Sequence, residues 1–304
     1  MSATLILLLP LLVLSAVALL AFAGCTPFTA EPGTEQPPTN GGDGQPKTYE
    51  EAVRKTAGLI AYWRLDETKL PPDPYPAAKD TGGVNNTLDG TYNGTVDLSN
   101  VEGALAKKEP ADKGTTFGGN GYVEVPFSPL LSPPMALSLE VWIQPGALTA
   151  PGIDQHVVAF RDVEGPVNSG FEINLNRTAG TSQIQGRICT GGEGGGPQAS
   201  EAYLELDDAK LGPGGPWRHV VMTFDGSTIT LYVDGDAGGP HQTQPVPVAY
   251  RRNLQQPFRI GTGRAPASPA PGQPYVGAID EVALYSMALD VKTVKDHYAK
   301  SGQP

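Results

Sequence analysis

Residues 217–235 carry the clearest alternation of hydrophobic and polar positions in the chain. The apolar positions that fall on one face of two successive extended halves are Val220, Met222, Phe224, Ile229, Leu231 and Val233. Alternation with a period of two, in runs rich in Val, Ile and Thr, is typical of half-buried strands. Asp225-Gly226 between the halves supplies turn residues, because glycine accepts a positive φ. The stretch therefore predicts a hairpin whose apolar face a second sheet must cover.

Shorter runs of the same kind recur along the chain. The other segments predicted to be strands are 59–65, 88–96, 115–117, 122–125, 137–143, 156–161, 171–176, 183–190, 202–206, 257–261 and 276–285. The glycine-rich residues 118–121 predict a second hairpin, which would join 115–117 to 122–125. Residues 49–56 and 290–299 predict two short helices, the second with Asp290 as its N-cap. Many short strands with two peripheral helices indicate an all-β, antiparallel two-sheet sandwich.

The N-terminus has a different character. Residues 5–23 are almost wholly apolar and end in Ala21-Phe22-Ala23-Gly24-Cys25. Small residues before a cysteine resemble a bacterial lipoprotein signal, in which residues 1–24 are a signal peptide and Cys25 receives lipid. No Lys or Arg precedes the apolar run, as a secretory signal normally requires, and an uncleaved membrane-spanning anchor is the alternative. Both interpretations place the rest of the chain outside the cytoplasm, in the bacterial cell envelope at the outer membrane or cell surface.

Composition separates a linker from a domain. Residues 25–47, which begin with the lipidated Cys25, are rich in Pro, Gly and Thr and bury too little apolar surface to fold, so they predict a disordered spacer. Residues 48–304 predict one domain, whose turns account for the 38 glycines and many of the 30 prolines. The net charge of −11 excludes a nucleic-acid partner. Cys25 and Cys189 are the only cysteines, so no disulfide framework exists, and Cys189 is expected to be a buried apolar residue.

An ordered set of motifs runs through the predicted domain. The motifs are YEEAVRKTAGLIAYWRLDE (49–67), AAKDTGGVNNTLDGTYNG (77–94), GYVEVP (121–126), LSLEVWIQP (137–145), WRHVVMTFDGSTITLYVDG (217–235), FRIGTG (258–263) and YVGAIDEVALYSMALD (275–290). With these motifs, residues 48–300 resemble the laminin G-like group of concanavalin A-like jelly rolls in its bacterial extracellular form. The resemblance implies two curved antiparallel sheets stacked face to face. Members of the group bind glycans, other proteins or no known ligand, so the fold alone does not define a function.

The resemblance also implies a metal. Related jelly rolls often hold one structural Ca²⁺ between an Asp at the start of the last strand and groups of the N-terminal loop. Asp280 matches the first position, and Asp80 with the pair Asp66-Glu67 matches the loop. Ca²⁺ prefers six to eight oxygen ligands, which carboxylates and loop carbonyls supply. The alternative is that Asp280 only caps or ion-pairs at a strand end.

Catalytic motifs are incomplete. The laminarinase-type enzymes of this fold use a Glu-x-Asp-x-x-Glu run, and here Glu205 and Asp207 are followed by Lys210 where the second Glu is needed. We expect that segment to be a solvated strand end. Glu140 stands alone beside Trp142, with no evident partner. The four histidines, His156, His219, His241 and His297, have no zinc-site spacing.

We therefore expect no enzymatic activity. The predicted function is a membrane-anchored, extracytoplasmic binding or adhesion module for a carbohydrate or cell-surface ligand. The alternatives are a laminarinase-like glycoside hydrolase and a purely structural surface protein. The aromatic side chains that could contact a sugar are Trp142, Tyr203, Trp217 and Tyr232, although for each a place in the sandwich core is the favoured interpretation, because aromatics dominate such cores. The sequence does not identify the ligand-binding residues.

Overall fold

A computed structural model provides the architecture. It describes residues 46–304 except 69–74, 84–86, 147–151, 165–166, 179–180, 192–198, 208–210, 237–241, 246–248 and 265–269, and it describes only the backbone of 199–207 and 242–245. The predicted signal peptide, Cys25 and nearly all of the predicted linker lie outside the described residues. Within the described part of the chain, no helix has both the length and the apolar character needed to span a bilayer.

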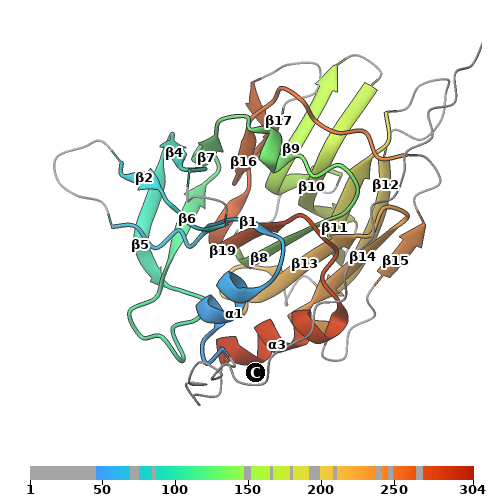
Figure 1. Cartoon of the computed structure of the whole chain (residues 1–304). Helices are drawn as coiled ribbons and strands as arrows, with labels where there is room; N and C mark the ends of the chain where they lie inside the picture. The colour runs from blue at the N-terminus through green and yellow to red at the C-terminus, as the bar shows by residue number, and fades with distance from the viewer. Residues whose placement is uncertain are drawn as a thin grey trace, which may run out of the picture. The chain divides into compact units, whose positions relative to one another are not determined.

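The first of two antiparallel sheets, sheet A, has nine strands (Figure 1). Its main path runs in the order β15 (Gln242–Pro245), β14 (Thr228–Val233), β13 (Arg218–Phe224), β8 (Leu137–Pro145), β19 (Val276–Tyr285), β1 (Leu59–Trp63) and β3 (Asp80–Gly83). β6 (Lys113–Gly118) also pairs with β19, and β5 (Val96–Glu102) pairs with β6.

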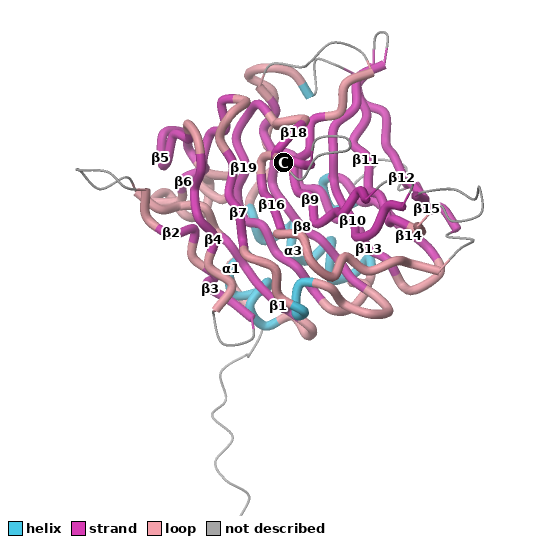
Figure 2. Tube along the Cα trace, turned by 90° about the horizontal axis from the view of Figure 1, so that it is seen from above, coloured by secondary structure: helices cyan, strands magenta, loops and turns pink. Residues whose placement is uncertain are grey.

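The second sheet, sheet B, has eight strands. Its order is β12 (Ala199–Asp207), β11 (Thr181–Cys189), β10 (Val167–Thr178), β9 (Gln155–Glu164), β16 (Phe258–Ile260), β7 (Tyr122–Val125), β4 (Gly90–Asn93) and β2 (Ala77–Ala78). Two-residue strands β17 (Gly263–Arg264) and β18 (Pro271–Gly272) pair with each other, and short 3-10 turns occur at Pro129–Leu131 and Asp234–Asp236. Figure 2 shows the strands of the two layers running past one another. The predicted all-β sandwich is confirmed.

The central hairpin forms as its alternation predicts. β13 pairs with β14 in the register Val220↔Val233 and Phe224↔Ile229. Its apolar face belongs to the core between the sheets. At the turn, Gly226 has a φ of +101°. The Asp225 carboxylate accepts hydrogen bonds from the backbone amides of Ser227 and Thr228, so the turn residues perform the expected role.

The second predicted hairpin is wrong. β6 lies in sheet A and β7 lies in sheet B, so the glycines at 118–121 carry the chain from one sheet to the other. Phe117 and Val123 therefore enter the same core from opposite sides. A Cβ on Gly121 would lie 2.1 Å from the Thr95 carbonyl oxygen, so only glycine permits this close approach. The local sequence indicates a turn but cannot distinguish pairing from crossing.

Two helices cover the outer face of sheet A. α1 (Tyr49–Lys55) is capped by Thr48, and α3 (Val291–Ser301) is capped by Asp290, whose carboxylate accepts from the Thr293 amide at 2.7 Å. A second apolar cluster forms beneath them, and it includes Tyr49, Trp142 and Val294. Strand β8 is consequently buried on both faces (Figure 1). This cover turns the polar-looking face of residues 137–143 into an interior surface.

Candidate functional site

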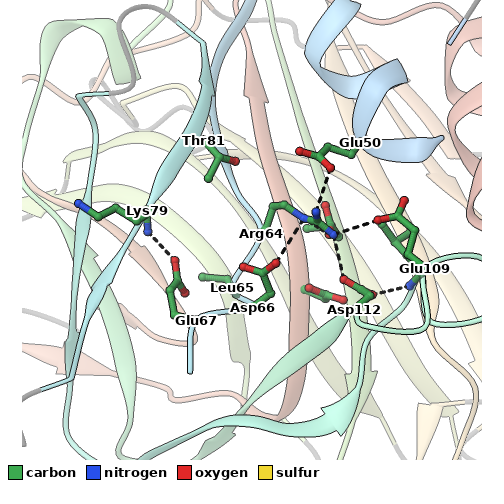
Figure 3. Close-up of polar contacts among 12 residues, drawn as sticks. Glu50, Arg64, Leu65, Asp66, Glu67, Lys79, Thr81, Glu109 and Asp112 are labelled. Carbon is green, nitrogen blue, oxygen red and sulfur yellow. Dashed lines mark hydrogen bonds and ion pairs between the residues drawn. The ribbon is translucent and has the colours of Figure 1, made fainter. Parts of the chain in front are cut away.

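A group of carboxylates surrounds Arg64, which directly follows β1 (Figure 3). We call this group the Arg64 cluster. The ion-pair distances from the guanidinium nitrogens are 3.0 Å to Glu50, 3.8 Å to Asp66, 3.3 Å to Glu109, 3.1 Å to Asp112 and 2.9 Å to Glu281. One cation therefore faces several anions, and the region keeps an excess of negative charge that a further cation could neutralise.

Asp280 adds the feature that points to a ligand. Its side chain is fully buried, Oδ2 accepts from the Ala104 amide at 2.8 Å, and Oδ1 accepts no hydrogen bond from any residue that the structure describes. One ligand oxygen each of Asp112, Asp280 and Glu281 lies within 4.8 Å of the others. Burial, reinforced by the neighbouring Asp112, raises the pKa of Asp280 well above its usual value. An unpaired buried carboxylate oxygen is costly unless a proton or a cation satisfies it.

Local backbone geometry gathers these oxygens. The pairing of β19 with β8 is irregular between Asp280 and Ala283, and Glu281 takes a φ of +53°. The irregularity buries both acids of the Asp280-Glu281 pair. Gly103 approaches from the other side, where a Cβ would lie 2.0 Å from Asp112 and 2.8 Å from Asp280. A positive φ at a non-glycine residue is a strained conformation that occurs preferentially at functional sites.

The set Asp112, Asp280 and Glu281 thus fits a hard cation by its donor chemistry. Carboxylates and the carbonyls of an adjacent glycine-containing segment are the oxygen ligands that Ca²⁺ takes. The three residues come from β19 and from the segment that follows β5, and Arg64 at the end of β1 adjoins them. A cation here would join β19 to the segment between β5 and β6.

The sequence-based metal residues are only partly brought together. Asp66 forms an ion pair with Arg64, which also pairs with Asp112 and Glu281. The negative charge of Asp66 contributes to the raised pKa of Asp280. Asp80 instead accepts from the amides of Tyr62, Gly82 and Leu88, and burial raises its pKa to about 6.

Glu67 also lies elsewhere, since it accepts from the Lys79 amide and the Tyr92 hydroxyl, each at 2.7 Å (Figure 3). Glu67 and Asp80 therefore shape the 59–92 region and do not face Asp280. The sequence reasoning missed Asp112 and Glu281. The Asp-Glu pair at 280–281 was a signal for the second of these, whereas no motif marks Asp112.

Glu140 has partners that the sequence did not reveal. It accepts hydrogen bonds from the hydroxyls of Tyr49 and Tyr285 at 2.8 Å and lies 2.7 Å from His219 Nε2 and 3.0 Å from His297 Nδ1. Burial acts to raise its pKa, but the charges and hydrogen bonds of His297 and His219 outweigh that effect and hold the pKa well below its usual range. The expectation that Glu140 stands alone is wrong. It is the centre of a buried structural network.

A second buried acid, Glu172 on β10, is held in the same way. Its carboxylate lies 3.0 Å from His156 Nδ1, 2.9 Å from Arg161 and 3.2 Å from Arg187. Burial opposes its ionisation, but these neighbours lower its pKa strongly. Among the described residues, the hydrogen-bond and ion-pair partners of Glu140 and Glu172 are tyrosines, histidines and arginines.

Cavities open on the described surface. One of about 600 Å³ lies beside the start of β13, and we call it the Trp217 groove. Its apolar lining consists of Val101, Ala106, Pro216 and Trp217. Its polar lining consists of Glu102, Lys107, Gln144 and Gln303. Two smaller cavities are near 200 Å³, one beside Arg64 and one beside Tyr122.

The other residues that the sequence analysis singled out differ in their burial, and some of them lie outside the described residues. Trp142 is fully buried, Tyr232 and Trp217 are 9% exposed, and the Tyr203 side chain lies outside the described residues. Of the enzyme-like run, Glu205 and Asp207 have only their backbone described, within β12, and Lys210 lies outside the described residues, as does His241. Cys189 is buried, as expected, and burial raises its pKa to about 12, which leaves an unreactive thiol.

Comparison with known proteins identifies the class. The family model Laminin_G_3, described as the concanavalin A-like lectin/glucanases superfamily, matches residues 117–295. The chain belongs to this family, which confirms the resemblance drawn from the motifs and the jelly-roll fold. In a search of curated proteins, no sequence matched the chain.

Solved structures with a similar fold include toxin binding domains. One is the binding domain of botulinum neurotoxin DC in complex with rat synaptotagmin II (TM-score 0.53, 12% identity, 80% of this chain and 52% of that chain). A second is that binding domain in complex with SialylT (TM-score 0.51, 12% identity, 81% and 52%). A third is the binding domain of Paraclostridial Mosquitocidal Protein 1 (TM-score 0.53, 16% identity, 79% and 52%). The chain spans about half the length of these structures, and at such identities the similarity shows the fold alone.

Proposed function

We propose that this protein is a non-catalytic binding module for a carbohydrate or another cell-surface ligand. The observation that carries the proposal is the Trp217 groove, in which Glu102 is the one carboxylate among the described lining residues. Glycoside hydrolysis usually requires two carboxyl groups on either side of the scissile bond, about 5 to 10 Å apart. The described lining of the groove offers an aromatic ring, amides and single charges that could bind a ligand, without a pair of carboxyl groups. The similar solved structures bear the names of binding domains. One is in complex with rat synaptotagmin II and one with SialylT, which supports a binding function for this chain.

A glycan array tests this proposal. The full-length chain would be purified in a zwitterionic detergent, because alkyl-glycoside detergents would compete for a sugar site. Retention of a defined glycan, without release of reducing sugar, is the expected result. Release of reducing sugar would favour the hydrolase alternative. If neither glycans nor cell surfaces retain the protein, the proposal fails in favour of the purely structural role.

We also propose that the module is held outside the cytoplasm by an N-terminal lipid on Cys25, after removal of residues 1–24. The apolar run 5–23 and the small residues before Cys25 support this. More than one acyl chain would be needed for stable anchoring. Cells fed a labelled fatty acid should label the wild-type protein and not the Cys25→Ser variant. Absence of label from both proteins, with residues 1–24 retained by mass, would favour the membrane-spanning alternative.

A structural Ca²⁺ completes the proposal. Asp112, Asp280 and Glu281 would hold it, with Asp66 nearby. The buried Asp280 Oδ1, which has no hydrogen-bond partner among the described residues, is the observation that supports a cation. Bound there, the ion would add a tie between sheet strands and would take no part in chemistry.

A further inference from the structure

The Trp217 groove is built from segments far apart in the chain. The end of β5 contributes Glu102, the following segment contributes Lys107, β8 contributes Gln144, and the C-terminus contributes Gln303. A volume of about 600 Å³ lies in the middle of the range, about 300 to 1,000 Å³, typical of small-molecule sites. The groove can therefore accept a ligand of a few rings.

The two amides of the groove have fixed orientations. Gln144 Nε2 donates to the Gly215 carbonyl at 2.9 Å, and Gln303 Nε2 donates to the Ala104 carbonyl at 2.6 Å. One hydrogen of each NH₂ group is thus bonded to the protein backbone, while neither Oε1 accepts a hydrogen bond from a described residue. Each glutamine presents an acceptor whose direction is set before a ligand arrives, which reduces the entropic cost of binding.

The charges of the groove balance. Glu102 and Lys107 are both exposed and form no ion pair with any residue that the structure describes. Together with the amides they provide several acceptors and one cationic donor, with no net charge. This pattern matches a neutral polyol, whose many hydroxyls donate to the acceptors, better than it matches a cation or an anion.

The apolar side of the groove complements the C–H surface of a sugar ring. Trp217 keeps 9% of its surface exposed, and its Nε1 donates to the Glu102 carbonyl at 3.1 Å, which holds the indole in place. Pro216 and Val101 extend this side. An extended peptide would instead gain most from pairing its backbone with a sheet edge, and tetraglycine serves below as the probe for that alternative.

From these features we infer that the Trp217 groove binds a short, neutral oligosaccharide. The inference rests on the proposed binding function and specifies its ligand class and its residues. Gln144 and Gln303 accept from the sugar hydroxyls, Glu102 and Lys107 contact the hydroxyls at the rim, and the Trp217 edge contacts a ring.

Titration calorimetry tests the inference on the full-length chain in a zwitterionic detergent. The probes are cellotriose, xylotriose, laminaritriose and chitotriose, with tetraglycine as the peptide probe. The variants are Glu102→Ala and Gln303→Ala, both at partly or fully exposed positions. The matched controls are Asp97→Ala, on the same strand as Glu102, and Gln256→Ala, since neither residue lines the groove.

At least one trisaccharide should bind, and each groove variant should weaken that binding about tenfold while the controls leave it unchanged. Equal binding by wild type and both groove variants would overturn the groove assignment and leave the binding function standing. Binding of tetraglycine alone, or of no probe, would overturn the oligosaccharide assignment. Only the additional failure on the glycan array and on cell surfaces would remove the binding function itself.

Discussion

Glu140 is fully buried between sheet A and the two helices, yet four side chains satisfy it. Burying a carboxylate is expensive unless donors and positive charge surround it. The two tyrosine hydroxyls and the two histidines supply both. At the residue scale, this acid is therefore a fastener that connects β8 and β13 to α1 and α3. Because its partners lower its pKa, it stays an ionised carboxylate.

Replacement of Glu140 tests that role. Glu140→Gln keeps the size of the side chain but places an amide NH₂ among donors and removes the negative partner of His297. We expect the free energy of unfolding to fall by about 3 kcal/mol. Glu51→Gln is the matched control, because Glu51 is exposed on α1 and the loss of its charge should change the free energy of unfolding little. Equal denaturation midpoints for the two variants would contradict the fastener role.

The buried carboxylate of Asp280 leads to a prediction that Ca²⁺ stabilises the fold. Ca²⁺ binding to the folded state alone should stabilise the wild type by about 2.7 kcal/mol at a hundredfold excess over Kd. Differential scanning calorimetry should show a higher Tm in Ca²⁺ than in EDTA. Asp280→Asn should abolish this difference, whereas Asp80→Asn should lower Tm in both conditions and keep it. A wild-type Tm that is equal in Ca²⁺ and in EDTA would refute the calcium proposal.

At the scale of elements, α3 is attached to the sandwich through His297. Burial acts to lower the pKa of His297, but the carboxylate of Glu140 outweighs this and raises the pKa above 6.5. The groups that face the ring are Glu140 on β8, Thr56 after α1, and Asp296 and Lys300 on α3 itself. The attachment is therefore strongest while His297 is protonated.

The raised pKa of His297 makes the free energy of unfolding depend on pH. A histidine whose folded pKa is raised adds stability that is fully present below about pH 6.5 and disappears as the pH rises through the folded pKa. Urea denaturation of the wild type should show stability falling across that window, and His297→Gln should flatten the fall. Lys292→Gln, on the exposed side of α3, is the control that should retain it. An unchanged slope in His297→Gln would assign the titration to another group.

Elements with strong local signals were predictable. The β13–β14 hairpin, strand β19 and the N-cap of α3 follow directly from alternation and from Asp290. The crossing at residues 118–121 was not predictable, because the same glycines serve a hairpin and a change of sheet. Asp112 could not be assigned to the Asp280 site, since residues far apart in sequence become neighbours only when the sandwich closes.

At the scale of the whole domain, the segment between Glu102 and Asp112 connects the two sites. Glu102 and Lys107 line the Trp217 groove, while the amides of Ala104 and Leu105 donate to Asp280 and Asp112. The sandwich positions this segment from both ends, because β5 precedes it and β6 follows it. The fold thus presents a groove at its surface beside the buried Asp280 and Asp112, and it holds Glu140 and Glu172 among positive and hydroxyl partners.

The most direct test of this account is the fate of a bound oligosaccharide. The full-length protein would be mixed at equal concentration with the trisaccharide that binds most tightly, held for a day, and examined by mass spectrometry. We predict that the trisaccharide is recovered intact and still associated with the protein. Recovery of mono- and disaccharides, lost again in Glu102→Ala, would show that the groove cleaves its ligand and would contradict the account.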